Sequence, residues 1–104
     1  MDYLNEKELN KYQVTIRFEM DEEFMSFVPP HRVYINSLIE KNVMDYYSVS
    51  METQRSWMII NAASKREVEQ ILAKSPLHKY WTIEVDELFV YDGQTYRLPA
   101  LQLN

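Results

Sequence analysis

Four side chains that could move a proton or hold an anion occur at positions that regular structure could bring together. Glu84 and Glu19 are carboxylates that can take a proton from a carbon next to a carbonyl group. His31 carries an imidazole that titrates near neutral pH and could act as a proton relay. Arg17 presents a planar cation suited to holding an anion. We take Glu84, Glu19 and His31 as candidate catalytic residues and Arg17 as a candidate substrate-binding residue.

The segment around Arg17 alternates between apolar and polar residues over positions 12–20. One face would carry Tyr12, Val14, Ile16, Phe18 and Met20, and the other Gln13, Thr15, Arg17 and Glu19. A period of two over nine residues is typical of a half-buried strand. The pattern therefore predicts that Arg17 and Glu19 lie on the face turned away from the core.

Two helices are predicted from their start and stop signals. Apolar residues at helical spacing follow Pro29-Pro30 and predict a helix over 30–41, with Asn42 as a left-handed cap. The irregular stretch 21–28 connects this helix to the first strand. Ser64 and Glu67 form a capping box that opens a second helix over 65–74.

Further strands are predicted over 43–51, 56–62 and 80–91, with a turn at 52–55. Asp92-Gly93 is a strong hairpin signal, because a type I′ turn needs positive φ at both central residues. We therefore expect a fifth strand over 94–98.

The element order β-α-β-β-α-β with a C-terminal hairpin strand predicts an α+β, ferredoxin-like fold. Residues 1–11 would form an N-terminal arm, 12–91 the α+β domain, and 92–104 the hairpin strand and tail. Two helices cover only one face of a sheet, so the other face needs a partner, for which a second copy is the simplest choice. If Tyr46, Met58 and Ile60 lie on that second face, they argue for such a partner.

In this fold the first and fourth strands are neighbours, and Glu84 would share a face with Arg17. The two side chains could form a structural or intersubunit salt bridge. They could equally be an anion-binding arginine beside a carboxylate base. The sequence leaves both interpretations open.

His31 and the aromatic residues also allow two interpretations. His31 falls on the Ile35 face at a helix start, where the positive end of the helix dipole favours a neutral imidazole. It is either a partly buried structural residue or a base. Tyr46 and Trp57 belong to a set of aromatics that suits a core or dimer interface, or the walls of a small-ligand pocket. That set comprises Tyr46, Tyr47, Trp57, Tyr80, Trp81 and Tyr91.

Composition excludes several classes of function. The 104 residues hold 16 acidic and 11 basic side chains, a net charge of −5, which disfavours nucleic acid as a partner. There is no cysteine, and the two histidines lack metal-ligand spacing, so neither a metal nor another cofactor is expected. No apolar run approaches the roughly 18 residues of a membrane span, and the N-terminus does not resemble a signal peptide. We expect a cytoplasmic protein.

Residues 75–88 read Ser-Pro-Leu-His-Lys-Tyr-Trp-Thr-Ile-Glu-Val-Asp-Glu-Leu. This segment resembles the end of muconolactone isomerases at Pro76, Leu77, Tyr80 and Ile83-Glu84-Val85, and residues 38–51 have a similar layout to the family's first helix and second strand. The chain also resembles YciI-like proteins, whose first helix carries a histidine near the position of His31. Both groups form dimeric α+β barrels. The resemblance implies a homodimer, or a ring of dimers, with a pocket enclosed between two sheets.

Two functions are compatible with this pattern. The first is isomerase-like proton transfer next to a carbonyl, with Glu84 or Glu19 as base, His31 as relay and Arg17 as anion holder. The second is a non-catalytic barrel that binds a small ligand or serves as an assembly module. A roomy, accessible pocket would favour the enzyme, and a lumen filled by side chains would favour the module.

Overall fold

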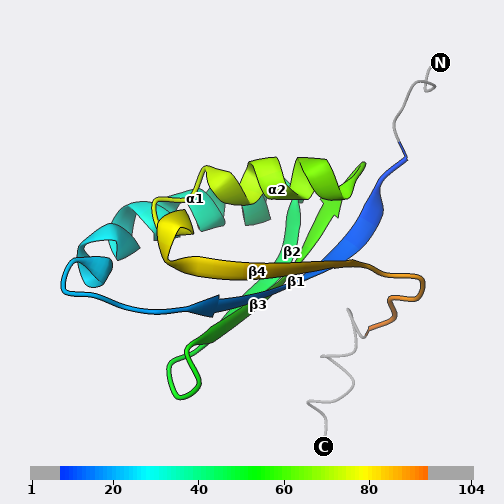
Figure 1. The fold of residues 1–104 in the computed structure, drawn as a ribbon. Coiled ribbons are helices and arrows are strands. Elements are labelled where there is room, and N and C mark those ends of the chain that lie inside the picture. The colour runs from blue at the N-terminus through cyan, green and yellow to red at the C-terminus, as the bar shows by residue number, and fades with distance from the viewer. Residues whose placement is uncertain (1–7, 94–104) are drawn as a thin grey trace, which may run out of the picture.

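A computed structural model of the chain describes residues 8–93. Four antiparallel strands form one sheet, and two helices lie on one face of it (Figure 1). Two short 3₁₀ turns, η1 and η2, precede helix α1 and strand β4. The elements are β1 (Asn10–Phe18), η1 (Phe24–Phe27), α1 (Val28–Glu40), β2 (Met44–Ser50), β3 (Arg55–Ala62), α2 (Lys65–Ala73), η2 (His78–Tyr80) and β4 (Trp81–Glu87).

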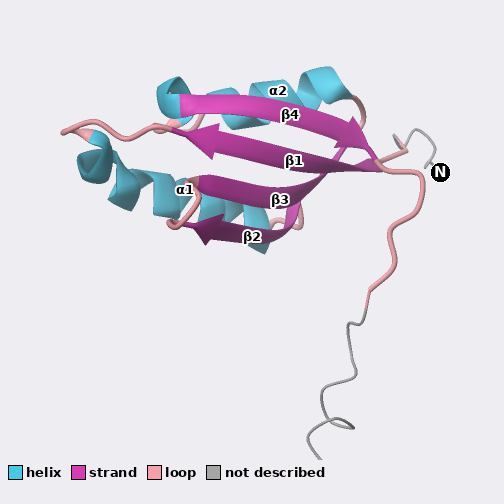
Figure 2. Cartoon of the chain, turned by 60° about the horizontal axis from the view of Figure 1, so that its bottom comes forward, coloured by secondary structure: helices cyan, strands magenta, loops and turns pink. Residues whose placement is uncertain are grey.

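The strand order is β2-β3-β1-β4, with β1 and β3 in the centre. Both central strands pair antiparallel with their neighbours, which is the arrangement of a ferredoxin-like α+β fold. Figure 2 shows the face of the sheet that the helices leave uncovered, here called the open face. The predicted α+β class and the adjacency of the first and fourth strands are confirmed.

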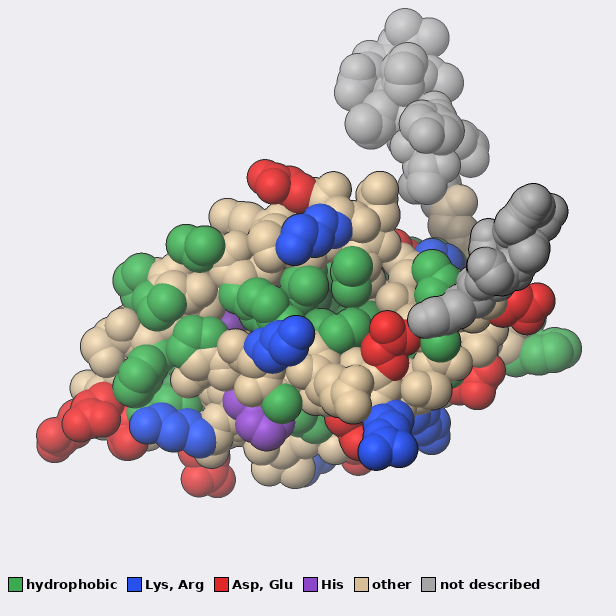
Figure 3. Space-filling model, turned by 90° about the horizontal axis from the view of Figure 1, so that it is seen from above, with side chains coloured by type: hydrophobic (Ala, Val, Ile, Leu, Met, Phe, Trp, Pro, Cys, Tyr) green, Lys and Arg blue, Asp and Glu red, His purple; other side chains and the backbone are tan. Residues whose placement is uncertain are grey.

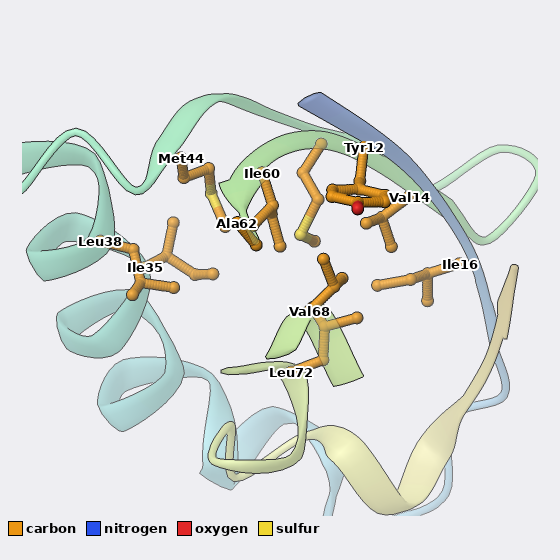
Figure 4. Close-up of a cluster of buried hydrophobic side chains, with 11 residues drawn as sticks. Tyr12, Val14, Ile16, Ile35, Leu38, Met44, Ile60, Ala62, Val68 and Leu72 are labelled. Atoms are coloured by element: carbon orange, nitrogen blue, oxygen red, sulfur yellow. The ribbon is translucent and has the colours of Figure 1, made fainter. Parts of the chain in front are cut away.

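The hydrophobic core lies between the sheet and the two helices (Figure 4). Strands β1 and β3 supply alternate residues to it, and side chains from α1 and α2 complete it from the helical layer. The buried set is Tyr12, Val14, Ile16, Ile35, Leu38, Met44, Met58, Ile60, Ala62, Val68 and Leu72. Met58 and Ile60 therefore do not lie on the second face and give no argument for a partner there, because β3 turns its even-numbered residues toward the helices. Tyr46 does lie on the open face, paired with Ile59 of β3.

Local caps explain where the helices begin and end. Ser64 Oγ accepts a hydrogen bond from Glu67 N at 3.1 Å, and Glu67 Oε1 accepts one from Ala63 N at 2.7 Å. The predicted capping box is thus present, with the glutamate reaching one residue further back than the usual position. Asn42 has a φ of 64°, which confirms the left-handed cap after α1.

Several predicted boundaries differ from the structure. Strand β1 begins and ends two residues earlier than expected, and α1 starts at Val28, directly after η1, rather than at Pro30. Strand β4 ends at Glu87, so the extension to Tyr91 was wrong. The last backbone bond between β4 and β1 is donated by Leu88 N to Lys11 O, and the pairing stops there although β1 continues to Asn10 against β3. The predicted fifth strand, 94–98, lies outside the described residues.

Candidate functional site

A pocket of about 270 Å³ opens at the end of the molecule where η1 and the first turn of α1 meet the β2–β3 hairpin. We call it the α1 pocket. Apolar side chains gather at this end of the helix-covered face (Figure 3). Its lining residues are Phe18, Phe24, Met25, Val28, His31, Arg32, Tyr47, Val49, Met51, Ser56, Leu77 and Trp81.

The floor of the α1 pocket is a small second core. Phe18 is the last residue of β1, and its ring stacks on that of Phe24 in η1 with the ring centroids 5.4 Å apart. Leu77 completes this buried cluster from the loop after α2. Burial of these rings fixes η1 against the sheet, and α1 continues directly from η1 without a side-chain N-cap. The pocket is therefore held by packing from three separate segments.

His31 lies inside this apolar environment and is 1% exposed. Its Nδ1 is 2.8 Å from Ser75 Oγ, and its Nε2 is 2.8 Å from Tyr47 Oη. The imidazole also packs edge-on against the Trp81 ring at 5.6 Å. Both ring nitrogens are thus satisfied by hydroxyl groups, and a buried polar side chain stands at the wall of the pocket.

Burial controls the ionisation of this site. It lowers the pKa of His31 from 6.5 to about 4, and the neighbouring Arg32 charge acts in the same direction. Burial also raises the pKa of Tyr47, opposed by the hydroxyl of Ser56 and the charge of Arg32. At neutral pH the site therefore holds a neutral imidazole and a neutral phenol. This agrees with the expected neutral state of His31, although the main cause is burial and not the helix dipole.

The open face carries a second, smaller concavity of about 90 Å³. It is lined by Thr15, Arg17, Arg55, Thr82 and Glu84. Arg17 is directly opposite Arg55 in the β1–β3 ladder, and Thr15 is opposite Glu84 in the β1–β4 ladder. Two like charges in direct cross-strand register are unfavourable unless an anion lies between or above them.

The structure brings some of the predicted site residues together and separates others. Arg17 and Glu84 share the small concavity, yet they are not within ion-pair distance of each other. Glu19 is exposed beyond the end of β1, near Arg17 and Arg55. His31 lies on the opposite side of the sheet from all of them, in the α1 pocket.

The two aromatic candidates are on the open face. Tyr46 is 39% exposed, and Trp57, which is half-buried, pairs with Thr15 of β1. Neither lines the α1 pocket. They could contact a ligand or a partner on the open face, but they cannot reach His31 through the sheet.

Sequence reasoning missed Ser75 and Arg55, which the geometry singles out, and it named Tyr47 only as one of six aromatic residues. Tyr47 could have been separated from Tyr46 by strand alternation, since adjacent residues point to opposite faces. Ser75 directly follows the predicted second helix, and nothing in the sequence ties it to His31, 44 positions away. Arg55 was assigned to a turn, whereas it is the first residue of β3.

Neither family models nor curated proteins gave a match to this chain. Within residues 8–93, no three or more histidine, aspartate or glutamate side chains are grouped so that they could hold a metal ion. No helix in the same range is long and apolar enough to cross a membrane. Function is therefore inferred from the geometry of the α1 pocket and of the open-face concavity.

Proposed function

We propose that the protein binds a small, mostly apolar molecule in the α1 pocket. The observation that carries this proposal is a buried, neutral His31, hydrogen-bonded to Tyr47 at the wall of an otherwise apolar pocket. Binding sites for small molecules combine an apolar lining with a few placed polar groups. A cavity of about 150 Å³ accepts benzene, so 270 Å³ has room for a substituted ring.

Calorimetric titration with ethylbenzene tests this proposal. Val28 is half-buried against the Phe18–Phe24 cluster, so Val28→Phe must place its larger side chain in the pocket. We expect this variant to bind at least about tenfold more weakly, equivalent to about 1.4 kcal/mol. Val33→Phe is the matched control, because Val33 lies on the same helix, is 70% exposed and does not line the pocket.

Equal binding by the wild type and Val28→Phe would place the ligand elsewhere and contradict the proposal. Absence of binding to the wild type would contradict it directly. Val33→Phe should bind ethylbenzene like the wild type. Equal weakening in Val33→Phe would mean that any phenylalanine added to α1 lowers the affinity.

The isomerase-like function is the second candidate, and its site would be on the open face. It is supported by the convergence of Arg17, Arg55 and Glu84 on one small concavity. The two guanidinium groups could hold a carboxylate or an enolate oxygen, and Glu84 could take the proton next to the carbonyl. A second copy packed on the open face would enclose this site and exclude water, as the resemblance to muconolactone isomerases implies.

Deuterium uptake from D₂O by a panel of unsaturated lactones tests the second candidate. If Glu84 is the base, Glu84→Gln abolishes the exchange at the carbon next to the carbonyl. Asp86→Asn is the matched control, since Asp86 is the next outward residue of β4 and does not line the concavity. Exchange that survives in Glu84→Gln, or that is lost equally in Asp86→Asn, would remove Glu84 from that role.

A further inference from the structure

A chain of hydrogen bonds runs from the loop after α2 to the wall of the α1 pocket. Leu77 N donates to Ser75 Oγ at 3.0 Å. Ser75 Oγ is 2.8 Å from His31 Nδ1, and His31 Nε2 is 2.8 Å from Tyr47 Oη. Ser75 and His31 are buried, at 6% and 1% exposure, so water does not compete for these bonds.

The need of the buried Ser75 hydrogen for an acceptor sets the direction of the other bonds. Ser75 Oγ already accepts from Leu77 N, and His31 Nδ1 is the acceptor within reach of its hydrogen. Nδ1 is then unprotonated, and Nε2 carries the ring proton and donates it to Tyr47 Oη. The reverse direction would leave the buried Ser75 hydrogen without an acceptor among residues 8–93, which costs free energy.

This direction determines the hydrogen bonding of Tyr47. Its oxygen accepts a hydrogen bond from His31 Nε2, so its own hydrogen must point to another acceptor. Within the protein the neighbouring acceptor is Ser56, whose own hydrogen goes to Ser48 O at 2.9 Å. Both Tyr47 and Ser56 line the α1 pocket. A ligand oxygen at this wall can receive the Tyr47 hydrogen in place of Ser56. The Arg32 guanidinium, 5.7 Å from the centre of the Tyr47 ring, adds a positive charge that favours an electron-rich group there.

We propose that Tyr47 is the recognition residue of the α1 pocket and selects small apolar molecules that carry a carbonyl oxygen. This inference rests on the proposed function, because it names the class of ligand for that pocket. Ser75 and His31 are positioning residues: they orient the phenol, and both ring nitrogens of His31 are already hydrogen-bonded within the protein. A hydrocarbon of the same shape would fill the pocket without using the Tyr47 hydrogen.

Acetophenone and ethylbenzene form a suitable pair of probes, since they differ by one carbonyl in place of a methylene group. Tyr47→Phe should weaken acetophenone binding by about tenfold, the factor expected for one lost hydrogen bond of about 1.4 kcal/mol. Ethylbenzene affinity should stay within about twofold. Tyr46→Phe is the matched control, because Tyr46 lies on the opposite face of the same strand, and it should change neither affinity.

Equal losses for the two probes in Tyr47→Phe, or none for either, would overturn Tyr47 as the recognition residue while leaving the pocket as a binding site. Failure of both probes to bind the wild type would overturn the proposed function itself. The ¹⁵N shifts of His31 in the wild-type protein give an independent readout of the chain's direction. We expect the proton on Nε2, and a proton on Nδ1 at neutral pH would contradict this direction.

Discussion

His31 shows how a single residue takes its chemical state from the elements around it. The imidazole belongs to α1 and is almost completely buried. Its hydrogen-bond partners are Tyr47 of β2 and Ser75 in the loop after α2. Desolvation disfavours the charged ring, and the nearby Arg32 adds like-charge repulsion. The stability of the protein is therefore linked to the protonation of this residue.

Acidification is expected to destabilise the protein through His31. The unfolded chain takes up the proton near pH 6.5 and the folded chain only near pH 4, so the unfolded state binds more protons between these values. Stability from this group is complete above pH 6.5 and falls as the pH decreases toward 4. The shift corresponds to about 3 kcal/mol at its full extent. Urea unfolding at a series of pH values measures the slope.

A comparison of two histidine variants isolates this effect from the titration of carboxylates. His31→Gln should flatten the pH dependence between pH 6.5 and 4, although it also lowers stability at pH 7. His78→Gln should retain the wild-type slope, since His78 is exposed in η2. An unchanged slope in His31→Gln would show that His31 is not the group responsible.

At the scale of elements, short-range signals predicted most of the fold. The alternation of β1, the capping box before α2 and the left-handed Asn42 each depend on neighbours within a few residues, and all three are present in the structure. Strand ends were predicted less well, because they depend on how far a distant strand continues to pair. The β4 terminus is an example: its pairing stops at Glu87, opposite Tyr12 of β1, more than 70 positions away.

The capping box of α2 gives a prediction about stability. Ser64→Ala removes the acceptor for Glu67 N and should cost about 1 kcal/mol of folding free energy. Ser64→Asp retains a side-chain acceptor at the cap and should remain close to the wild type. Thermal unfolding followed by circular dichroism measures both. Equal losses in the two variants would mean that the hydroxyl acts through something other than capping.

The end of α1 gives a second prediction at this scale. In Asn42→Ala the backbone must keep its left-handed conformation without the short polar side chain that makes asparagine tolerant of positive φ. We expect this variant to destabilise the fold by about 1 kcal/mol. Asn42→Gly adopts this conformation without strain and should be tolerated. The measurement is the free energy of unfolding in urea. Greater damage from glycine than from alanine would contradict the role of the positive φ.

At the scale of the whole molecule, the sheet divides the candidate residues into two groups. Sequence reasoning placed Arg17 and Glu84 on one face, and the structure brings them to one concavity. It could not show that His31 lies behind the sheet with Tyr47 and Ser75, since these contacts join positions 16 and 44 residues apart. The α1 pocket could not be predicted from the sequence, because it is formed by packing between segments that are distant along the chain.

The open face gives a prediction about assembly. If a second copy covers it, Trp57→Glu should convert the dimer to a monomer, because a half-buried aromatic in the central strand β3 becomes a charge in the interface. Val33→Glu places the same charge on the exposed side of α1 and should leave the assembly intact. Sedimentation velocity measures both variants. A wild-type monomer would remove the enclosed open-face site and leave the α1 pocket unaffected.

The most direct test of the central claim is a methyl-NMR titration of the wild-type protein with acetophenone. Binding in the α1 pocket predicts chemical-shift changes at the methyl groups of Met25, Val28, Val49 and Met51, which line it. The methyl groups of Ile59, on the other side of the sheet, should be unaffected. Shifts centred on Ile59, or no shifts at saturating ligand, would contradict the assignment of the α1 pocket as the ligand site.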